Sequence, residues 1–260
     1  MKPTTGQGKV WLVGAGPGDP ELLTLKAARI IAAADVILID ALVNRAVLAH
    51  ARADVRVIDT GKRGGCKSTP QDFIERLMVR EAQAGHTVVR LKGGDPFLFG
   101  RGGEEWRAAL EAGLDIEAVP GITSALAATA TLGVPATDRN ACPGVAFVTG
   151  HRRDGATEPD WAALARSGLT LMIYMGVANV EHICERLVAG GLGPATPALA
   201  ISAATLPQQK SVTATLSTLA ETVRRGGIAS PAMLVIGEVT RAVAQAMPPG
   251  LMTAQPRMFA

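Results

Sequence analysis

One glycine-rich segment, residues 90–105 (RLKGGDPFLFGRGGEE), constrains the fold of this chain more than any other. Residues 87–91 are apolar and β-branched, which predicts a buried strand, and residues 104–112 have the pattern of a helix. The glycine-rich turn therefore follows the carboxyl end of a strand, which is where ligands bind in open α/β sheets. Its glycines allow the backbone to approach such a ligand closely.

Two charged side chains of this turn are candidates for ligand contacts. Asp95 is a fixed acceptor for a ribose or an ammonium group, and Arg101 is placed to bind an anion. The alternative is a tight turn that carries a solvated acid and a solvated base. The two glycine pairs that flank the Asp-Pro-Phe sequence favour the ligand site.

A second glycine turn lies near the start of the sequence. Residues 9–13 predict a first strand, and residues 14–20 (GAGPGDP) lead from it into a helix over residues 21–33. The dinucleotide fingerprint G-x-G-x-x-G is not met, because Asp19 takes its last position. Pro17 also lacks the N–H that would bind a pyrophosphate. The turn therefore favours a ligand without a pyrophosphate, which argues against a nicotinamide dehydrogenase.

Charged residues follow the next two predicted strands. Asp40 comes directly after a buried strand at residues 36–39, where it is a ribose ligand, a general base or a turn cap. A short helix around residues 44–50 precedes a strand at residues 55–58. This strand leads into a second glycine-rich loop, which carries the adjacent cations Lys62 and Arg63. These cations are either solvated or part of a site, since loops at this edge of a sheet commonly carry function.

The alternation of strands and helices is interrupted once. A strand at residues 116–119 leads into Thr123 and Ser124 at a helix N-terminus, where they cap the helix or bind a carboxylate or hydroxyl. Residues 133–144 then lack periodicity. Strands and helices resume with a strand at residues 145–149, and the alternation of residues 210–215 predicts an antiparallel strand. This pattern predicts an α/β protein with two α/β domains and a ligand cleft between them. The predicted domains are residues 9–135 and 144–246, with flexible tails at residues 1–8 and 247–260.

The composition excludes several classes of protein. The net charge of +3, from 26 basic and 23 acidic residues, is too balanced to favour a nucleic acid partner. Three cysteines without a C-x-x-C pair and four histidines without ligand spacing predict no disulfide framework and no metal site. The uncharged stretches 118–137 and 187–209 are broken by Pro and Gly, so neither predicts a membrane span. Residues 1–8 lack an apolar secretory segment, and we expect a cytoplasmic location.

Several motifs together resemble those of the tetrapyrrole methyltransferase family, over residues 9–241. The run at residues 92–105 is the most specific of them. The other matching motifs are residues 13–20, Asp40 with Leu42 and Val43, and residues 61–63, 120–125, 149–151, 174–176 and 237–239.

The resemblance implies the tetrapyrrole methylase fold, a homodimer, and S-adenosyl-L-methionine as the cofactor, which leaves as S-adenosyl-L-homocysteine. The cofactor would lie in the cleft between the two domains. By position, the family's cofactor contacts fall on Pro17, Gly93, Gly94, Asp95, Leu98, Thr123, Ser124, Met175, Ala204 and Ala232.

The resemblance also implies roles for charged residues. The proton acceptor and donor proposed in the family fall on Asp40 and Lys62. Candidate contacts to the acidic side chains of the substrate are Arg63, Arg101 and Arg139.

The activity implied by the resemblance is C-methylation of uroporphyrinogen III. Two successive methyl transfers would give precorrin-2 for cobalamin or sirohaem biosynthesis. Two alternatives stay open, namely methylation of a later precorrin intermediate and non-catalytic binding of the tetrapyrrole or the cofactor. The sequence departs from the family pattern at Ala41 and Asp138, where many members have Arg and His.

Overall fold

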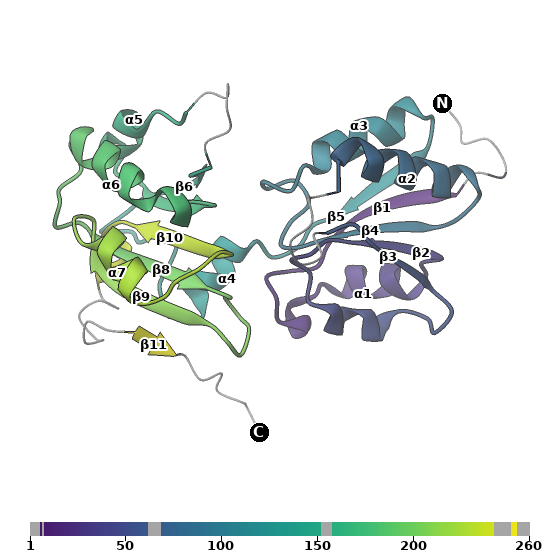
Figure 1. Cartoon of the computed structure of the whole chain (residues 1–260), viewed down its shortest axis with the longest axis horizontal. Helices are drawn as coiled ribbons and strands as arrows, with labels where there is room; N and C mark the ends of the chain where they lie inside the picture. Colours follow the sequence, from purple (N-terminus) through teal and green to yellow (C-terminus); the bar gives the residue numbers. More distant parts are fainter. Residues whose placement is uncertain (1–5, 7, 62–68, 152–157, 242–250, 254–260) are drawn as a thin grey trace. The chain divides into compact units, whose positions relative to one another are not determined.

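The computed structural model describes residues 6, 8–61, 69–151, 158–241 and 251–253, the last three by their backbone alone. The chain divides into two compact units, Met1–Thr123 and Ser124–Ala260. Each unit has its own sheet with helices packed on it (Figure 1). The expected fold class, two α/β units, is confirmed.

The first unit is built on a five-stranded sheet with the strand order β3-β2-β4-β1-β5. All neighbouring strands in it are parallel. Its strands are β1 (Lys9–Gly14), β2 (Val36–Ile39), β3 (Arg56–Asp59), β4 (Val88–Lys92) and β5 (Asp115–Val119). Because the strands are parallel, all five carboxyl ends lie at one edge, which we call the carboxyl edge.

Helices cover both faces of this sheet, because alternate strand residues point to opposite sides. Val89 and Leu91 pack in one cluster with Ile31 of α1 (Leu25–Ala32). Val88 packs in a second cluster with Met78 of α2 (Gln71–Gln83), and α3 (Gly102–Glu111) covers the same face (Figure 1). The alternation places Arg90 and Lys92 on the α2 and α3 face.

Two predicted helices of the first unit differ in detail. The single helix expected over residues 21–33 is a 3₁₀ turn, η1 (Pro20–Leu22), followed by α1. Thr24 separates them because its backbone is extended and its Oγ1 accepts the N–H of Ala27 at 3.1 Å. The helix expected at residues 44–50 is likewise a 3₁₀ turn, η2 (Arg45–His50).

The second unit has a six-stranded sheet with the strand order β11-β9-β8-β10-β7-β6. Only β6 and β7 are parallel neighbours, and the other pairs are antiparallel. Its strands are β6 (Val145–Thr149), β7 (Thr170–Tyr174), β8 (Pro197–Ser202), β9 (Lys210–Thr215), β10 (Ala232–Ile236) and β11 (Leu251–Thr253). The antiparallel strand predicted at residues 210–215 is confirmed. Within the tail expected at 247–260, β11 pairs with β9, and the rest lies outside the described residues.

Four helices pack on the second sheet. One face carries α5 (Trp161–Arg166), α6 (Val180–Ala189) and α7 (Leu219–Arg225). The other face carries α4 (Ser124–Ala130), where Ala125 and Ala128 pack in one cluster with Met172. Residues 124–134 therefore pack with the second unit, whereas the predicted domain boundary assigned them to the first.

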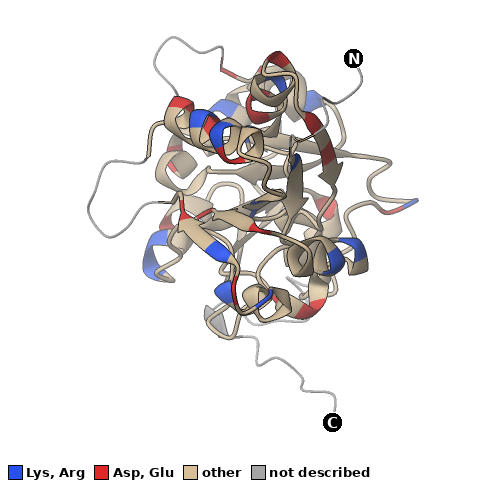
Figure 2. Cartoon of the chain, turned by 90° about the vertical axis from the view of Figure 1, so that its right-hand side faces the viewer, with Lys and Arg blue, Asp and Glu red and all other residues tan. Residues whose placement is uncertain are grey.

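The charged residues and two of the cysteines are distributed as in an ordinary globular protein. Figure 2 shows Lys and Arg interspersed with Asp and Glu along the helices. Cys142 and Cys184 are free and buried, and burial, with a smaller contribution from Glu185, raises the pKa of the Cys184 thiol to about 11. Within the described ranges, no helix is both long and apolar enough to cross a membrane.

Four glycines bring the carboxyl ends of β1, β4 and β5 into backbone contact. Gly94 and Gly16 pair through two N–H···O hydrogen bonds of 2.7 and 3.3 Å. A Cβ on Gly121 would lie 2.1 Å from the Gly94 carbonyl oxygen, and a Cβ on Gly14 would lie 2.5 Å from the Gly121 nitrogen. A side chain at either position would separate the two glycine turns from β5.

Gly121→Ala is therefore expected to lower the free energy of unfolding by about 1–3 kcal/mol or more, because overpacking costs this much in rigid surroundings. Urea unfolding followed by circular dichroism measures the change. The matched control is Gly103→Ala on α3, where an added Cβ meets nothing within 4 Å. It should leave stability unchanged or raise it by up to about 1 kcal/mol, since alanine favours helix. Equal effects of the two substitutions would contradict the close contact.

Candidate active site

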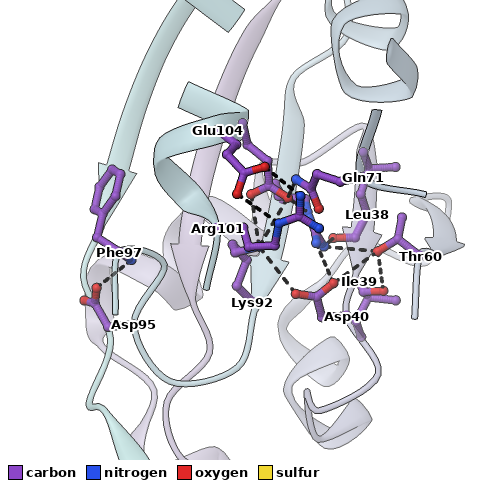
Figure 3. A network of polar contacts seen from close by, with 12 residues as sticks. Leu38, Ile39, Asp40, Thr60, Gln71, Lys92, Asp95, Phe97, Arg101 and Glu104 are labelled. Carbon is purple, nitrogen blue, oxygen red and sulfur yellow. Dashed lines mark hydrogen bonds and ion pairs between the residues drawn. The ribbon is translucent and has the colours of Figure 1, made fainter. Parts of the chain in front are cut away.

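Asp40 lies at the carboxyl edge of the first sheet, directly after β2 (Figure 3). Its side chain is 29% exposed. Its Oδ1 lies 2.5 Å from Arg90 Nη2, and its Oδ2 lies 3.5 Å from Lys92 Nζ. Thr60 donates a third, longer hydrogen bond of 3.4 Å from Oγ1 to Oδ1. Asp40 is thus a partly exposed carboxylate held by buried donors.

Arg90 connects Asp40 to the interior of the unit. Its side chain is 2% exposed. Its Nε donates to Glu105 Oε1 at 2.8 Å. Its Nη1 donates to the Leu38 carbonyl oxygen at 3.3 Å and to Thr60 Oγ1 at 3.1 Å. The guanidinium therefore bonds β2, the end of β3 and α3 at once.

Glu105 is the fully buried end of this network. Its side chain is 0% exposed, and Lys92 Nζ lies 3.2 Å from its Oε1 and 3.0 Å from its Oε2. Gln71 of α2 donates to Oε1 at 3.3 Å. Burial alone would lower the pKa of Arg90, but the Asp40 and Glu105 carboxylates raise it above its ordinary value. Two cations and two carboxylates thus balance formally beneath α2 and α3.

The predicted cofactor residues of the first unit gather at the same carboxyl edge. The Gly16–Gly94 pairing brings the turn with Pro17 beside the turn with Gly93, Asp95 and the half-buried Leu98. Buried Thr123 follows β5.

Asp95 has two partners of its own. Its Oδ1 accepts the N–H of Phe97 at 2.9 Å (Figure 3). Its Oδ2 accepts the N–H of Gly121 at 3.1 Å. Asp95 therefore fixes the glycine-rich turn, while the carboxylate oxygens keep further acceptor capacity.

Arg101, a predicted substrate contact, lies at the start of α3 with a positive φ of 58°. It makes a two-point contact with Glu104, Nε to Oε1 at 2.9 Å and Nη2 to Oε2 at 2.6 Å. This contact raises the pKa of Arg101 against the opposing effect of partial burial. Its side chain is 52% exposed, so the paired guanidinium remains accessible.

In the second unit the predicted cofactor residues lie at one edge of the mixed sheet. Met175 follows β7, and Ala232 begins the antiparallel β10, whose Met233 pairs with Tyr174. Ala232 pairs with Ser202 at the end of β8, just before Ala204.

Ser124 reaches this edge through its neighbour Ala125, whose N–H donates to Tyr174 Oη at 3.2 Å. Three non-glycine residues at the edge have positive φ: Met175 (54°), Ala203 (48°) and Thr205 (68°). Backbone strain of this kind collects at ligand sites.

The remaining predicted contacts are Arg139, Lys62 and Arg63. Arg139 is exposed in the connection between α4 and β6. Lys62 and Arg63 lie outside the described residues. Among the residues that the structure describes, no three His, Cys, Asp or Glu side chains form a group that could hold a metal ion.

A family model described as Tetrapyrrole (Corrin/Porphyrin) Methylases matches residues 9–220. The chain belongs to this family. The resemblance inferred from the sequence motifs is thereby confirmed at the level of the family.

Named relatives of this tetrapyrrole methylase are similar over most of its length. A uroporphyrinogen-III C-methyltransferase of Pseudomonas aeruginosa is 53% identical over 90% of this chain and 95% of that protein. A siroheme synthase of Acinetobacter baylyi is 46% identical over 91% of this chain, which spans 52% of that longer protein. A solved uroporphyrin-III C-methyl transferase of Thermus thermophilus, complexed with S-adenyl homocysteine, is 42% identical. Its TM-score is 0.78, and the match covers 90% of this chain and 94% of that one.

Sequence reasoning assigned no role to three residues of the buried network: Arg90, Lys92 and Glu105. A signal for them was present, because two basic residues stand at alternate positions at the end of an apolar, buried strand. Charges in such a strand require buried counter-charges. The sequence does not say which acid supplies this counter-charge. Glu104 and Glu105 are adjacent on α3, and only the structure shows that Glu105 is the buried partner.

Glu105→Leu is expected to lower the free energy of unfolding by about 3–5 kcal/mol, because it leaves two buried cations facing one carboxylate, Asp40. Urea unfolding measures the loss. Asp72→Asn is the matched control, because Asp72 pairs with Arg76 on the exposed surface of α2. It should leave stability close to that of the wild type, since solvent screens such a pair. A Glu105→Leu protein as stable as the control would contradict the role of the network.

Proposed function

We propose that this chain methylates uroporphyrinogen III at carbon, with S-adenosyl-L-methionine as the methyl donor. Two successive transfers would yield precorrin-2, for sirohaem or cobalamin biosynthesis. The observation that carries the proposal is the 53% identity to a uroporphyrinogen-III C-methyltransferase over nearly the full length of that enzyme. The relative solved with S-adenyl homocysteine supports the choice of cofactor.

The donor set of the chain fits this cofactor. Backbone groups of two closely packed glycine turns and the Asp95 carboxylate are available in the first unit. The second unit offers a strained edge with the half-exposed Met175. The residues proposed to hold the cofactor are Pro17, Gly93, Gly94, Asp95, Leu98, Thr123, Ser124, Met175, Ala204 and Ala232. When bound, the cofactor supplies an electrophilic methyl group.

Asp40 is proposed as the proton acceptor. Methylation of a pyrrole carbon leaves a cationic ring that must lose a proton from the macrocycle. Asp40 suits this step because its carboxylate is 29% exposed and is fixed by Arg90 and Thr60. Lys62 is proposed as the proton donor. The acidic side chains of the substrate are proposed to contact Arg63, Arg101 and Arg139.

The assembly and location belong to the same proposal. From the family resemblance we infer a homodimer in the cytoplasm that binds the tetrapyrrole substrate. From the balanced charge of the sequence we infer that it binds neither nucleic acid nor a membrane.

Anaerobic incubation of the protein with uroporphyrinogen III and S-adenosyl-L-methionine should add two methyl groups to the tetrapyrrole. Mass spectrometry of the product measures the gain. A reaction without protein is the control. No gain with uroporphyrinogen III, together with a gain on an already methylated precorrin, would overturn the proposed substrate and leave methyl transfer intact.

Asp40→Asn should lower kcat by about 10²–10⁴-fold, the usual contribution of a positioned base. The amide keeps the shape of the carboxylate but does not accept the proton. Binding of S-adenosyl-L-homocysteine, measured by calorimetry, should be unchanged, because Asp40 is not among the proposed cofactor contacts. An unchanged kcat would remove Asp40 from the mechanism.

A further inference from the structure

The Arg90 guanidinium is buried at a place where the proposed reaction makes no direct use of it. It is 2% exposed, and its Nε, Nη1 and Nη2 atoms all donate to protein acceptors. The group is therefore closed to a substrate carboxylate. A buried charge carries a large desolvation cost. Its position directly behind Asp40 suggests what it contributes.

The shape of the guanidinium matters as much as its charge. Nη2 contacts Asp40, while Nη1 contacts Thr60 and the Leu38 carbonyl, and Nε contacts Glu105. These acceptors come from β2, the end of β3 and α3. A planar fork with five N–H groups can hold such acceptors in one fixed arrangement, whereas the single ammonium of a lysine cannot.

Glu105 fixes Arg90 from behind. Its carboxylate is fully buried and accepts from Nε at 2.8 Å, while Asp40 accepts from the neighbouring Nη2. The second cation, Lys92, lies closer to Glu105 (3.0 Å) than to Asp40 (3.5 Å). Asp40 thus has its shortest contact with Arg90, and Arg90 is kept in place by a residue that itself has no access to solvent.

We propose that Arg90, anchored by Glu105, is a positioning residue that fixes the orientation of the Asp40 carboxylate for proton abstraction. This inference rests on the proposed function. A purely structural role is the competing explanation, since any break in a buried ion network destabilises a fold. The two explanations differ in kinetics, because positioning acts through Asp40 and a structural effect does not.

Arg90→Lys is the central test, since it keeps the charge and removes the fork. We expect kcat to fall about 10–100-fold, because a misplacement of about 1 Å in a reacting group has effects up to that size. KM for S-adenosyl-L-methionine should change less than twofold. In an Asp40→Asn background, Arg90→Lys should cause no further loss, because the positioned carboxylate is already gone. Equal losses in both backgrounds would overturn the proposal.

Glu105→Gln is the second variant, and it decides the question if Arg90→Lys does not fold. Its amide can still accept from Arg90 Nε but leaves two cations facing one carboxylate. It should lower kcat in the wild-type background and not in Asp40→Asn. The matched control is Glu81→Gln. Glu81 is 6% exposed and pairs with Arg56 and Arg80 near the opposite edge of the sheet. It should lower thermal stability and leave kcat unchanged.

A crystal structure of Arg90→Lys separates failure of this inference from failure of the proposed function. If the wild type methylates no tetrapyrrole, the proposed function falls, and the position of Asp40 still decides the inference. We expect the Asp40 carboxylate to rotate away from its wild-type orientation in the variant. A carboxylate that stays in place would overturn the positioning role, whatever reaction the protein catalyses.

Discussion

The carboxyl edge of the first unit depends on one buried ion network with Arg90 at its centre. The guanidinium joins β2, β3 and α3 through side chains and lies on β4 itself. Without it, the fully buried Glu105 carboxylate would keep Lys92 but lose one of its two cations. Since burial penalises every member alone, the network is stable only when strand order and helix placement are both correct. We infer that it specifies the arrangement of this edge more than it adds to stability.

Beside the ion network, the carboxyl edge is formed by close contacts between backbone segments. Gly14, Gly94 and Gly121 meet so closely that neither Gly14 nor Gly121 has room for a Cβ, and Asp95 ties the glycine-rich turn to Gly121. Backbone groups of these glycines and the Asp95 carboxylate therefore lie at this junction. The proposed cofactor contacts Gly94 and Asp95 belong to it, whereas the proposed base, Asp40, is held by the buried ion network and is 29% exposed. Different residues of the edge therefore serve the two proposed roles.

Strands were predictable from the sequence because burial of apolar runs is local information. The strands β2, β6 and β9 have the predicted bounds. Helix limits were less predictable, since Thr24 has an extended backbone and its side chain caps the start of α1 inside the segment expected to be one helix. The assignment of residues 124–134 depended on packing against the second sheet, which no local pattern reports. The motifs of the site could be recognised in the sequence. The Arg90–Glu105 contact could not be predicted, because it depends on which face of β4 is covered by α3.

Exposure within the network separates Asp40, the proposed base, from the groups that hold it. Arg90, Lys92 and Glu105 are at most 3% exposed, whereas Asp40 is 29% exposed. Only Asp40 can therefore meet a substrate, and the other three can act only through it. A base on a loop would lose orientation with every movement of the backbone. A base at a strand end, held by a guanidinium that is itself held by a buried carboxylate, moves only if the sheet and α3 move together.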